Sequence, residues 1–228
     1  MELIYMPMVL LFIVFIIVLL PKYFRFRNSD YQFKSGNSFF KTIFDKGSYG
    51  EFLTFSYLEE LKMFKKLLVN IYVPKEDGLT TEIDLIMLSP TGIYVFESKN
   101  YSGWIFGNEK SRYWTQTLES KQKNKFYNPI WQNKGHITAL KKLLELQYDD
   151  IFKSYIIFSE RCTLKKLEYD SSKTKLIKRD DLISTLNEDI ANSPNILKVD
   201  EILNTYTKLK EYSNVDDIIK KKHIENIS

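Results

Sequence analysis

The longest apolar stretch of the chain lies at its beginning. Residues 3–20 contain no charged side chain. A helix of this length reaches roughly 27 Å, close to the bilayer hydrocarbon thickness of about 30 Å. A cleaved signal peptide is one alternative, but no Lys or Arg precedes the stretch and no small-residue cleavage site follows it. A buried core helix, the other alternative, is rarely apolar on every side. We therefore expect residues 1–21 to form a transmembrane anchor.

The charges beside this stretch predict its orientation. Lys22, Arg25 and Arg27 follow it, whereas Glu2 precedes it. Because basic residues are enriched on the cytoplasmic side of membrane helices, we expect a single-pass protein with its C-terminal domain in the cytoplasm. The lone Cys162 fits a reducing compartment.

Strand and helix patterns alternate beyond residue 40. They predict a mixed α/β domain over residues 41–212, between a juxtamembrane linker at 22–40 and a polar tail at 213–228. Strands are predicted at 67–73, 81–88, 93–99, 153–160 and 175–178, the last at a sheet edge, with a hairpin at 102–117. Helices are predicted after Gly50, over 128–147, and at 180–191 and 199–212.

The second and third predicted strands bring two carboxylates together. If the SPTG segment between them forms the turn, paired residue numbers sum to 181 and Asp84 lies opposite Glu97. Lys99 shares the face of Glu97, because side chains two residues apart in a strand point the same way. Opposed carboxylates repel, and a divalent cation offsets this repulsion. The alternative is a solvated patch in which Lys99 and Glu82 neutralise the pair.

The helix over 128–147 adds two polar side chains to this picture. Asn128 suits its N-cap. At 100° per residue, Gln132 lies in line with Ala139 on the apolar side, and His136 lies about 40° away. Polar groups that point into a core need partners. The alternatives are an amide satisfied near the helix start for Gln132 and an imidazole bonded to backbone for His136.

Four sequence blocks resemble a known family. The blocks are GSYGE (47–51), TEIDLIML (81–88), GIYVFESKNYSGWIFG (92–107) and NPIWQN (128–133). In order and spacing they are similar to the nuclease-related domain family, assigned to the PD-(D/E)xK restriction-endonuclease-like superfamily. The likeness covers about residues 44–160 and implies a restriction-endonuclease-like mixed sheet flanked by helices. Ile83 replaces the proline that precedes the superfamily's first aspartate, which removes no ligand.

This resemblance implies a metal-dependent phosphodiesterase site. Asp84 and Glu97 would ligate Mg²⁺, or Mn²⁺ in its place. Lys99 would orient or activate the attacking water, Glu51 would complete the acidic cluster through a second metal or a water, and Gln132 would steady the lysine or the phosphate. Phosphodiester hydrolysis suits these residue types because a metal stabilises charge on the phosphate oxygens and lowers the pKa of its bound water.

Aromatic side chains follow the predicted site and are candidates for substrate binding. Tyr101, Trp104 and Trp114 can stack on unpaired bases, although packing in a core is the alternative. His136 is a further candidate for substrate binding. A net charge of +4 with mixed acids and bases permits a nucleic-acid partner without requiring one.

Together these features predict a membrane-anchored, Mg²⁺-dependent nuclease, with DNA favoured over RNA. A non-catalytic scaffold that binds nucleic acid or protein on the same fold is the alternative, because a fold does not guarantee an activity. A structural membrane protein, in which Glu97 and Lys99 form a surface pair, is the third hypothesis.

Overall fold

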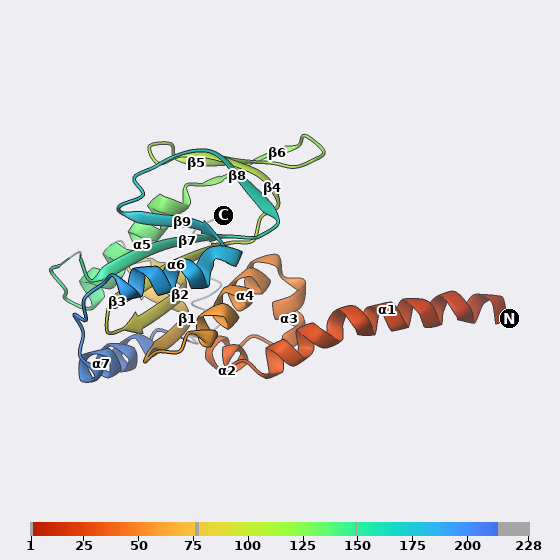
Figure 1. The fold of residues 1–228 in the computed structure, drawn as a ribbon, viewed down its shortest axis with the longest axis horizontal. Coiled ribbons are helices and arrows are strands. Elements are labelled where there is room, and N and C mark those ends of the chain that lie inside the picture. Colours follow the sequence, from red (N-terminus) through yellow and green to blue (C-terminus); the bar gives the residue numbers. More distant parts are fainter. Residues whose placement is uncertain (1, 76–77, 149, 214–228) are drawn as a thin grey trace.

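The computed structural model describes residues 2–75, 78–148 and 150–213. They form a mixed α/β fold of two mixed sheets flanked by helices, with one long helix that extends away from the rest (Figure 1). The predicted mixed sheet flanked by helices is confirmed, and the second sheet adds to it. Apart from Ser213, the predicted polar tail lies outside the described residues.

The larger sheet carries the strands of the predicted site. Its strand order is β1-β2-β3-β7-β9, in which the first three are antiparallel and β3, β7 and β9 are parallel. The strands are β1 (Lys66–Pro74), β2 (Thr80–Ser89), β3 (Gly92–Lys99), β7 (Phe152–Phe158) and β9 (Thr174–Lys178). All five predicted strands are therefore confirmed, including the edge position of the last.

The pairing of β2 with β3 follows the predicted register. The loop between them has two residues, 90–91, and Leu85 pairs with Phe96, so paired numbers sum to 181. Pairing ends there, so Asp84 and Glu97 come directly after the last pair. The turn chemistry of the sequence therefore brings the two carboxylates to the same end of the hairpin.

The smaller sheet packs beside β7 and β9. Its order is β6-β5-β4-β8, formed by β4 (Gly103–Asn108), β5 (Tyr113–Thr117), β6 (Lys123–Tyr127) and β8 (Cys162–Glu168). The hairpin predicted at 102–117 is confirmed, whereas β6 and β8 are strands that the sequence pattern did not predict. Their lysines mask any apolar alternation. A shared core joins the sheets, through Ile105, Trp114, Ile156, Phe158, Cys162 and Leu176.

Two pairs of helices cover opposite faces of the larger sheet. On one face, α4 (Lys46–Glu60) and α6 (Leu182–Ala191) pack against a cluster that includes Leu85 and Phe96. On the other face, α5 (Pro129–Leu143) and α7 (Val199–Lys210) pack against a cluster that includes Val95. The alternation of β3 side chains thus divides its residues between α4 and α5.

The boundaries of α4 and α5 follow from their caps. Asn128 caps α5 as predicted, and its side chain accepts a hydrogen bond from Ile130 N at 3.0 Å. α5 ends at Leu143 rather than at residue 147. α4 begins earlier than predicted, at Lys46, because the Asp45 side chain accepts a hydrogen bond from Ser48 N at 2.7 Å and caps the helix there.

Residues 22–40 belong to the folded structure rather than to a simple linker. α1 (Glu2–Arg27) continues past the apolar stretch and is followed by α2 (Tyr31–Ser35) and α3 (Phe39–Phe44). Phe26 and Tyr31 are fully buried, with ring centroids 5.5 and 5.3 Å from that of Phe52 on α4. The linker interpretation is wrong in this respect, because two aromatic residues of the segment turn into the core.

Among the described residues, α1 is the one helix long and apolar enough to cross a membrane, a property of its length and composition alone. Its side chains from Val9 to Val18 are largely exposed wherever they are described, which no core helix of a soluble domain shows. Figure 1 shows α1 projecting from the domain without a covering element along its N-terminal part.

Candidate active site

The end of β3 lies between α4 and α5, and successive side chains contact them in turn. Lys99 faces α5, where its Nζ donates a hydrogen bond to Gln132 Oε1 at 3.0 Å. Ser98 faces α4, where its Oγ lies 3.3 Å from Thr54 Oγ1. The strand period of two therefore distributes neighbouring residues of the ESKN run between two helices.

Glu97 is buried and has a protein partner on each carboxylate oxygen. Oε1 lies 2.7 Å from Lys99 Nζ, and Oε2 lies 3.0 Å from His136 Nε2. Burial alone would raise the pKa of Glu97, but Lys99 and then His136 outweigh it and hold this pKa below its usual value. Glu97 thus stays ionised, and because it is 1% exposed the solvated-patch alternative does not hold for it.

His136 is linked to the site through side chains on both of its ring nitrogens. Nδ1 lies 2.8 Å from Thr81 Oγ1, while Nε2 contacts Glu97. The backbone-bonded alternative is therefore not what the structure shows. As a buried residue it is placed to orient Glu97 rather than to meet a substrate directly.

Lys99 is held between two oxygen acceptors. Burial lowers the pKa of its ammonium, but the negative charges of Glu97 and Asp84 outweigh burial and raise this pKa above its usual value. Lys99 is therefore a fixed cation near neutral pH. Gln132 accepts a hydrogen bond from Lys99. The structure therefore brings together the lysine and the glutamine side chain that the family resemblance leads us to expect in contact.

Asp84 is tied to β3 by a hydrogen bond from the backbone. Its Oδ2 accepts the N–H of Ser98 at 2.8 Å. The pKa of Asp84 is raised well above its usual value, first by burial and then by the negative charges of Glu97 and Glu51, against the opposing effect of Lys99. The negative charge of Glu97 therefore adds to burial in disfavouring ionisation of Asp84.

Glu51 joins this acidic cluster from the first turns of α4. Burial and the charges of Glu82, Asp45 and Glu97 raise its pKa to about 8. The Tyr31 hydroxyl lies 3.4 Å from Glu51 Oε2 and offers it only a long hydrogen bond. Three carboxylates from three elements thus share a region in which ionising all of them is costly.

Two of these carboxylates suit a hard divalent cation. In the described ranges, no group of three or more His, Cys, Asp or Glu side chains is close enough to form a metal site by itself. Mg²⁺, however, usually keeps several waters and takes one or two carboxylates together with substrate phosphate oxygens. Asp84 and Glu97 supply this donor chemistry, and a cation between them would relieve the repulsion that raises the pKa of Asp84. The residues present therefore fit Mg²⁺ or Mn²⁺.

Comparison with known proteins identifies a family for the chain. The profile of the nuclease-related domain family matches residues 46–159, a range that includes Glu51, Asp84, Glu97, Lys99 and Gln132. The chain belongs to this family. An uncharacterized protein from Bacillus anthracis is 36% identical over 184 residues, which cover 79% of this chain and 82% of that protein. No solved structure matches the chain.

The aromatic candidates of the nuclease-related domain differ in exposure. Trp104 is 40% exposed on β4 and remains available to a ligand. Tyr101 is partly buried, with its ring centroid 4.7 Å from that of Phe126. Trp114 is 1% exposed, and its Nε1 donates a hydrogen bond to the Asn108 carbonyl at 3.0 Å. Trp114 is therefore a core residue, as the alternative held.

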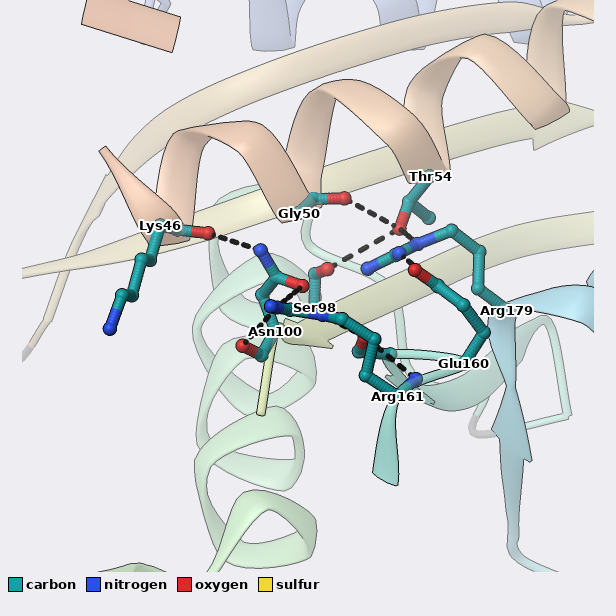
Figure 2. A network of polar contacts seen from close by, with 9 residues as sticks. Lys46, Gly50, Thr54, Ser98, Asn100, Glu160, Arg161 and Arg179 are labelled. Carbon is teal, nitrogen blue, oxygen red and sulfur yellow. Dashed lines mark hydrogen bonds and ion pairs between the residues drawn. The ribbon is translucent and has the colours of Figure 1, made fainter. Parts of the chain in front are cut away.

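A buried arginine contacts α4 and lies outside the residue range that the family profile matches (Figure 2). Arg179 Nη1 lies 2.7 Å from Glu160 Oε2, and its Nε donates a hydrogen bond to Thr54 Oγ1 at 3.3 Å. Thr54 in turn contacts Ser98, whose N–H holds Asp84. Sequence reasoning missed Arg179, because its contact with Thr54 spans 125 residues and leaves no local pattern.

Arg161 and Asn100 complete this network at the start of α4 (Figure 2). Arg161 Nη2 donates hydrogen bonds to Asn100 O and Oδ1, and Asn100 Nδ2 donates one to the Lys46 carbonyl at 2.7 Å. A Cβ at Gly50 would lie 2.7 Å from the Asn100 Cβ, so the helix approaches β3 this closely only with glycine there. Asn100, directly after the Glu-x-Lys triplet, was the residue of this network that the sequence placed next to the predicted site.

Proposed function

We propose that this member of the nuclease-related domain family is a membrane-anchored, metal-dependent nuclease that hydrolyses nucleic-acid phosphodiesters, with DNA the favoured substrate. The observation that carries the proposal is the position of Lys99, whose Nζ lies 2.7 Å from Glu97 Oε1 and 3.0 Å from Gln132 Oε1. A lysine fixed beside two carboxylates that suit Mg²⁺ can stabilise the negative charge that develops on a phosphate during phosphodiester hydrolysis.

Each side chain of the site has a role in this proposal. Asp84 and Glu97 hold Mg²⁺ or Mn²⁺, which when bound lowers the pKa of a coordinated water and stabilises charge on the phosphate. Lys99, whose pKa is raised, acts as a fixed cation that orients the attacking water and the scissile phosphate rather than as a base. Gln132 accepts a hydrogen bond from the Lys99 ammonium and keeps it in place.

Glu51 and His136 assist from either side of β3. Burial and neighbouring carboxylates raise the pKa of Glu51 to about 8, so it can accept or return a proton at its Oε atoms during turnover. His136 fixes the orientation of the Glu97 carboxylate through Nε2. Trp104, the most exposed of the three aromatic candidates, can stack on a base.

The anchor and its orientation are part of the same proposal. α1 meets the length and composition of a membrane span, and Lys22, Arg25 and Arg27 follow its apolar stretch. The basic flank favours a cytoplasmic location of the nuclease-related domain. Protease treatment of intact cells tests this directly, since digestion of the domain from outside would overturn the orientation.

Cleavage by the full chain in lipid nanodiscs tests the nuclease. Single-stranded, duplex and branched DNA, and RNA, are incubated with Mg²⁺, with Mn²⁺ or with EDTA. We expect metal-dependent cleavage that falls by a factor on the order of 100 or more in Lys99→Met and Asp84→Asn. Lys134→Met, an exposed lysine two residues beyond Gln132 on α5, is the matched control and retains activity.

Two outcomes would reject the nuclease. One is an inert wild-type protein that behaves like Lys99→Met on every substrate with either metal. The other is nucleic-acid binding without cleavage that Glu97→Gln leaves unchanged, which favours the scaffold alternative.

A further inference from the structure

Helix α3 presents two large aromatic side chains to the outside of the protein. Phe40 and Phe44 are 63% and 66% exposed, and their rings are nearly parallel with centroids 6.2 Å apart. Stacked exposed phenylalanines are unfavourable in water and mark a surface that another apolar phase covers. Phe33 on the preceding helix α2 (Tyr31–Ser35) is also exposed, at 79%.

An apolar groove separates α3 from the membrane-spanning candidate α1. Val14, Val18 and Leu19 of α1 line one side, and Ile43 and Phe44 of α3 line the other. Lys22 lies in the lining as well, at the end of the groove nearer the domain. The apolar stretch of α1 and the exposed face of α3 are therefore one continuous surface.

The position of α3 beside α1 is fixed by packing. The Phe39 ring contacts those of Tyr23 and Phe26 on α1, with centroids 5.3 and 5.6 Å apart. Phe26 is buried in the core of the domain. The position of α3 along the axis of α1 is therefore fixed. If α1 crosses a bilayer, its depth in the membrane also sets the depth of α3.

The depth expected for α3 in the bilayer agrees with the depth of an interfacial helix. Val14 precedes Leu20, the last residue of the apolar stretch, by six positions, which is about 9 Å along a helix. Amphipathic helices in a membrane interface bury their apolar side about 5–10 Å into the boundary between headgroups and acyl chains. The exposed Lys41 is placed to reach a lipid phosphate with its ammonium group, whereas the Lys22 ammonium lies 5.1 Å from the centroid of the Tyr49 ring.

We propose that α3 lies in the membrane interface of an anionic phospholipid bilayer, with Phe40 and Phe44 among the acyl chains and lipid filling the groove between α1 and α3. This inference rests on the membrane anchor of the proposed function and is independent of catalysis. The protein then contacts the bilayer at two elements, so the domain is docked on the membrane surface rather than suspended from α1.

Spin labels on the full chain test this docking. Single cysteines replace Phe40, Phe44, Ile17 or Tyr148, and the buried Cys162, whose thiol pKa is raised by burial, is left unlabelled. The protein is placed in nanodiscs of phosphatidylcholine and phosphatidylglycerol. Collision of each label with oxygen, which concentrates in lipid, is compared with collision with a water-soluble nickel chelate.

Ile17 on α1 and Tyr148 after α5 serve as the lipid and water references, since they are 64% and 79% exposed. We expect labels at Phe40 and Phe44 to collide mainly with oxygen, at a shallower depth than the label at Ile17. The two positions are labelled separately, so a label that disturbs one position leaves the other as a test.

Three results would overturn the inference, and each has a different meaning. If the Ile17 label is in lipid but the Phe40 and Phe44 labels resemble Tyr148, α3 is in water and the anchor alone stands. If the Ile17 label is also in water, the anchor of the proposed function fails too. If labels at Phe40 broaden one another's spectra until unlabelled protein is added, a second copy of the chain covers α3.

Discussion

Glu97 and His136 meet across the interface between β3 and α5, with 3.0 Å between Oε2 and Nε2. Together with Lys99, this imidazole keeps the pKa of Glu97 below its usual value. His136→Leu should therefore raise the pKa of Glu97, so that Glu97 becomes protonated at a higher pH. We expect the acidic limb of the kcat/KM profile with Mg²⁺ to move to higher pH.

The nuclease activity of His136→Leu should fall roughly 10- to 100-fold, the usual effect of removing a group that orients a metal ligand. His136→Gln, which can still donate a hydrogen bond to Glu97, should recover part of the loss. Thr81→Val removes the partner of Nδ1 without touching Glu97 and should have the smaller effect. A His136→Leu profile that overlays the wild-type profile would show that Glu97 does not depend on this contact.

The raised pKa of Glu51 predicts a pH-dependent stability. Its pKa is about 8 in the folded protein against an ordinary value of 4.5, so the folded state holds this proton more tightly than the unfolded state. The stabilisation is complete below about pH 4.5 and is lost as pH rises through about 8. Glu51→Gln, which cannot ionise, should match wild type in acid and exceed it by about 1–3 kcal/mol near pH 9.

Denaturant unfolding of the full chain in detergent with EDTA measures the difference in stability between Glu51→Gln and wild type, in acid and near pH 9. Added Mg²⁺ should narrow it at high pH, because a bound cation stabilises the ionised carboxylates. A difference that is the same at acidic and alkaline pH would instead indicate a change in packing.

Two glycines on the helices that flank the site provide a matched pair. Gly50→Ala places a Cβ 2.7 Å from the Asn100 Cβ and must displace α4 from the end of β3, whereas a Cβ at Gly135 on α5 has nothing within 4 Å. We expect Gly50→Ala to lower the free energy of unfolding by about 1–3 kcal/mol and to reduce cleavage. Gly135→Ala should raise stability by about 0.5–1 kcal/mol and leave cleavage unchanged. Thermal unfolding and the cleavage assay distinguish them, and similar behaviour of both variants would disprove the close approach.

Truncation separates the contribution of the apolar stretch of α1 from that of the buried residues that follow it. Removal of residues 1–20 leaves Phe26 and Tyr31 in place, whereas removal of residues 1–37 takes away both buried rings. The longer truncation should cost about 3–6 kcal/mol of stability relative to the shorter one, since each buried aromatic side chain contributes about 1.5–3 kcal/mol. Circular dichroism melting compares the two proteins. Equal melting temperatures would mean that the aromatic pair contributes little.

The hairpin and its carboxylates were predictable because the information is local. Strand alternation and the two-residue turn fix the register of β2 and β3, and hence place Asp84 and Glu97 at one end. Helical periodicity and the Asn128 cap likewise placed Gln132 and His136 on the side of α5 that faces β3. Each of these inferences needs only residues close in sequence.

Features that depend on distant contacts were missed. Phe26 and Tyr31 lie in a segment without periodicity, so nothing local shows that they turn into the core. β8 is rich in lysine and becomes a strand through its parallel pairing with β4, far from it in sequence. Arg179 meets α4 only because the chain returns to the sheet as β9.

The burial of Phe26 has a consequence for how a substrate is found. A domain on a flexible tether samples a volume set by the length of the tether. Here α1 runs into the core, so if α1 spans a bilayer as proposed, Lys99 stays at one height and one tilt. The protein then surveys a thin layer parallel to the membrane as it diffuses laterally. On the proposed function, nucleic acid would be met only where its backbone is brought to that layer, and the membrane would help to determine which strands are within reach.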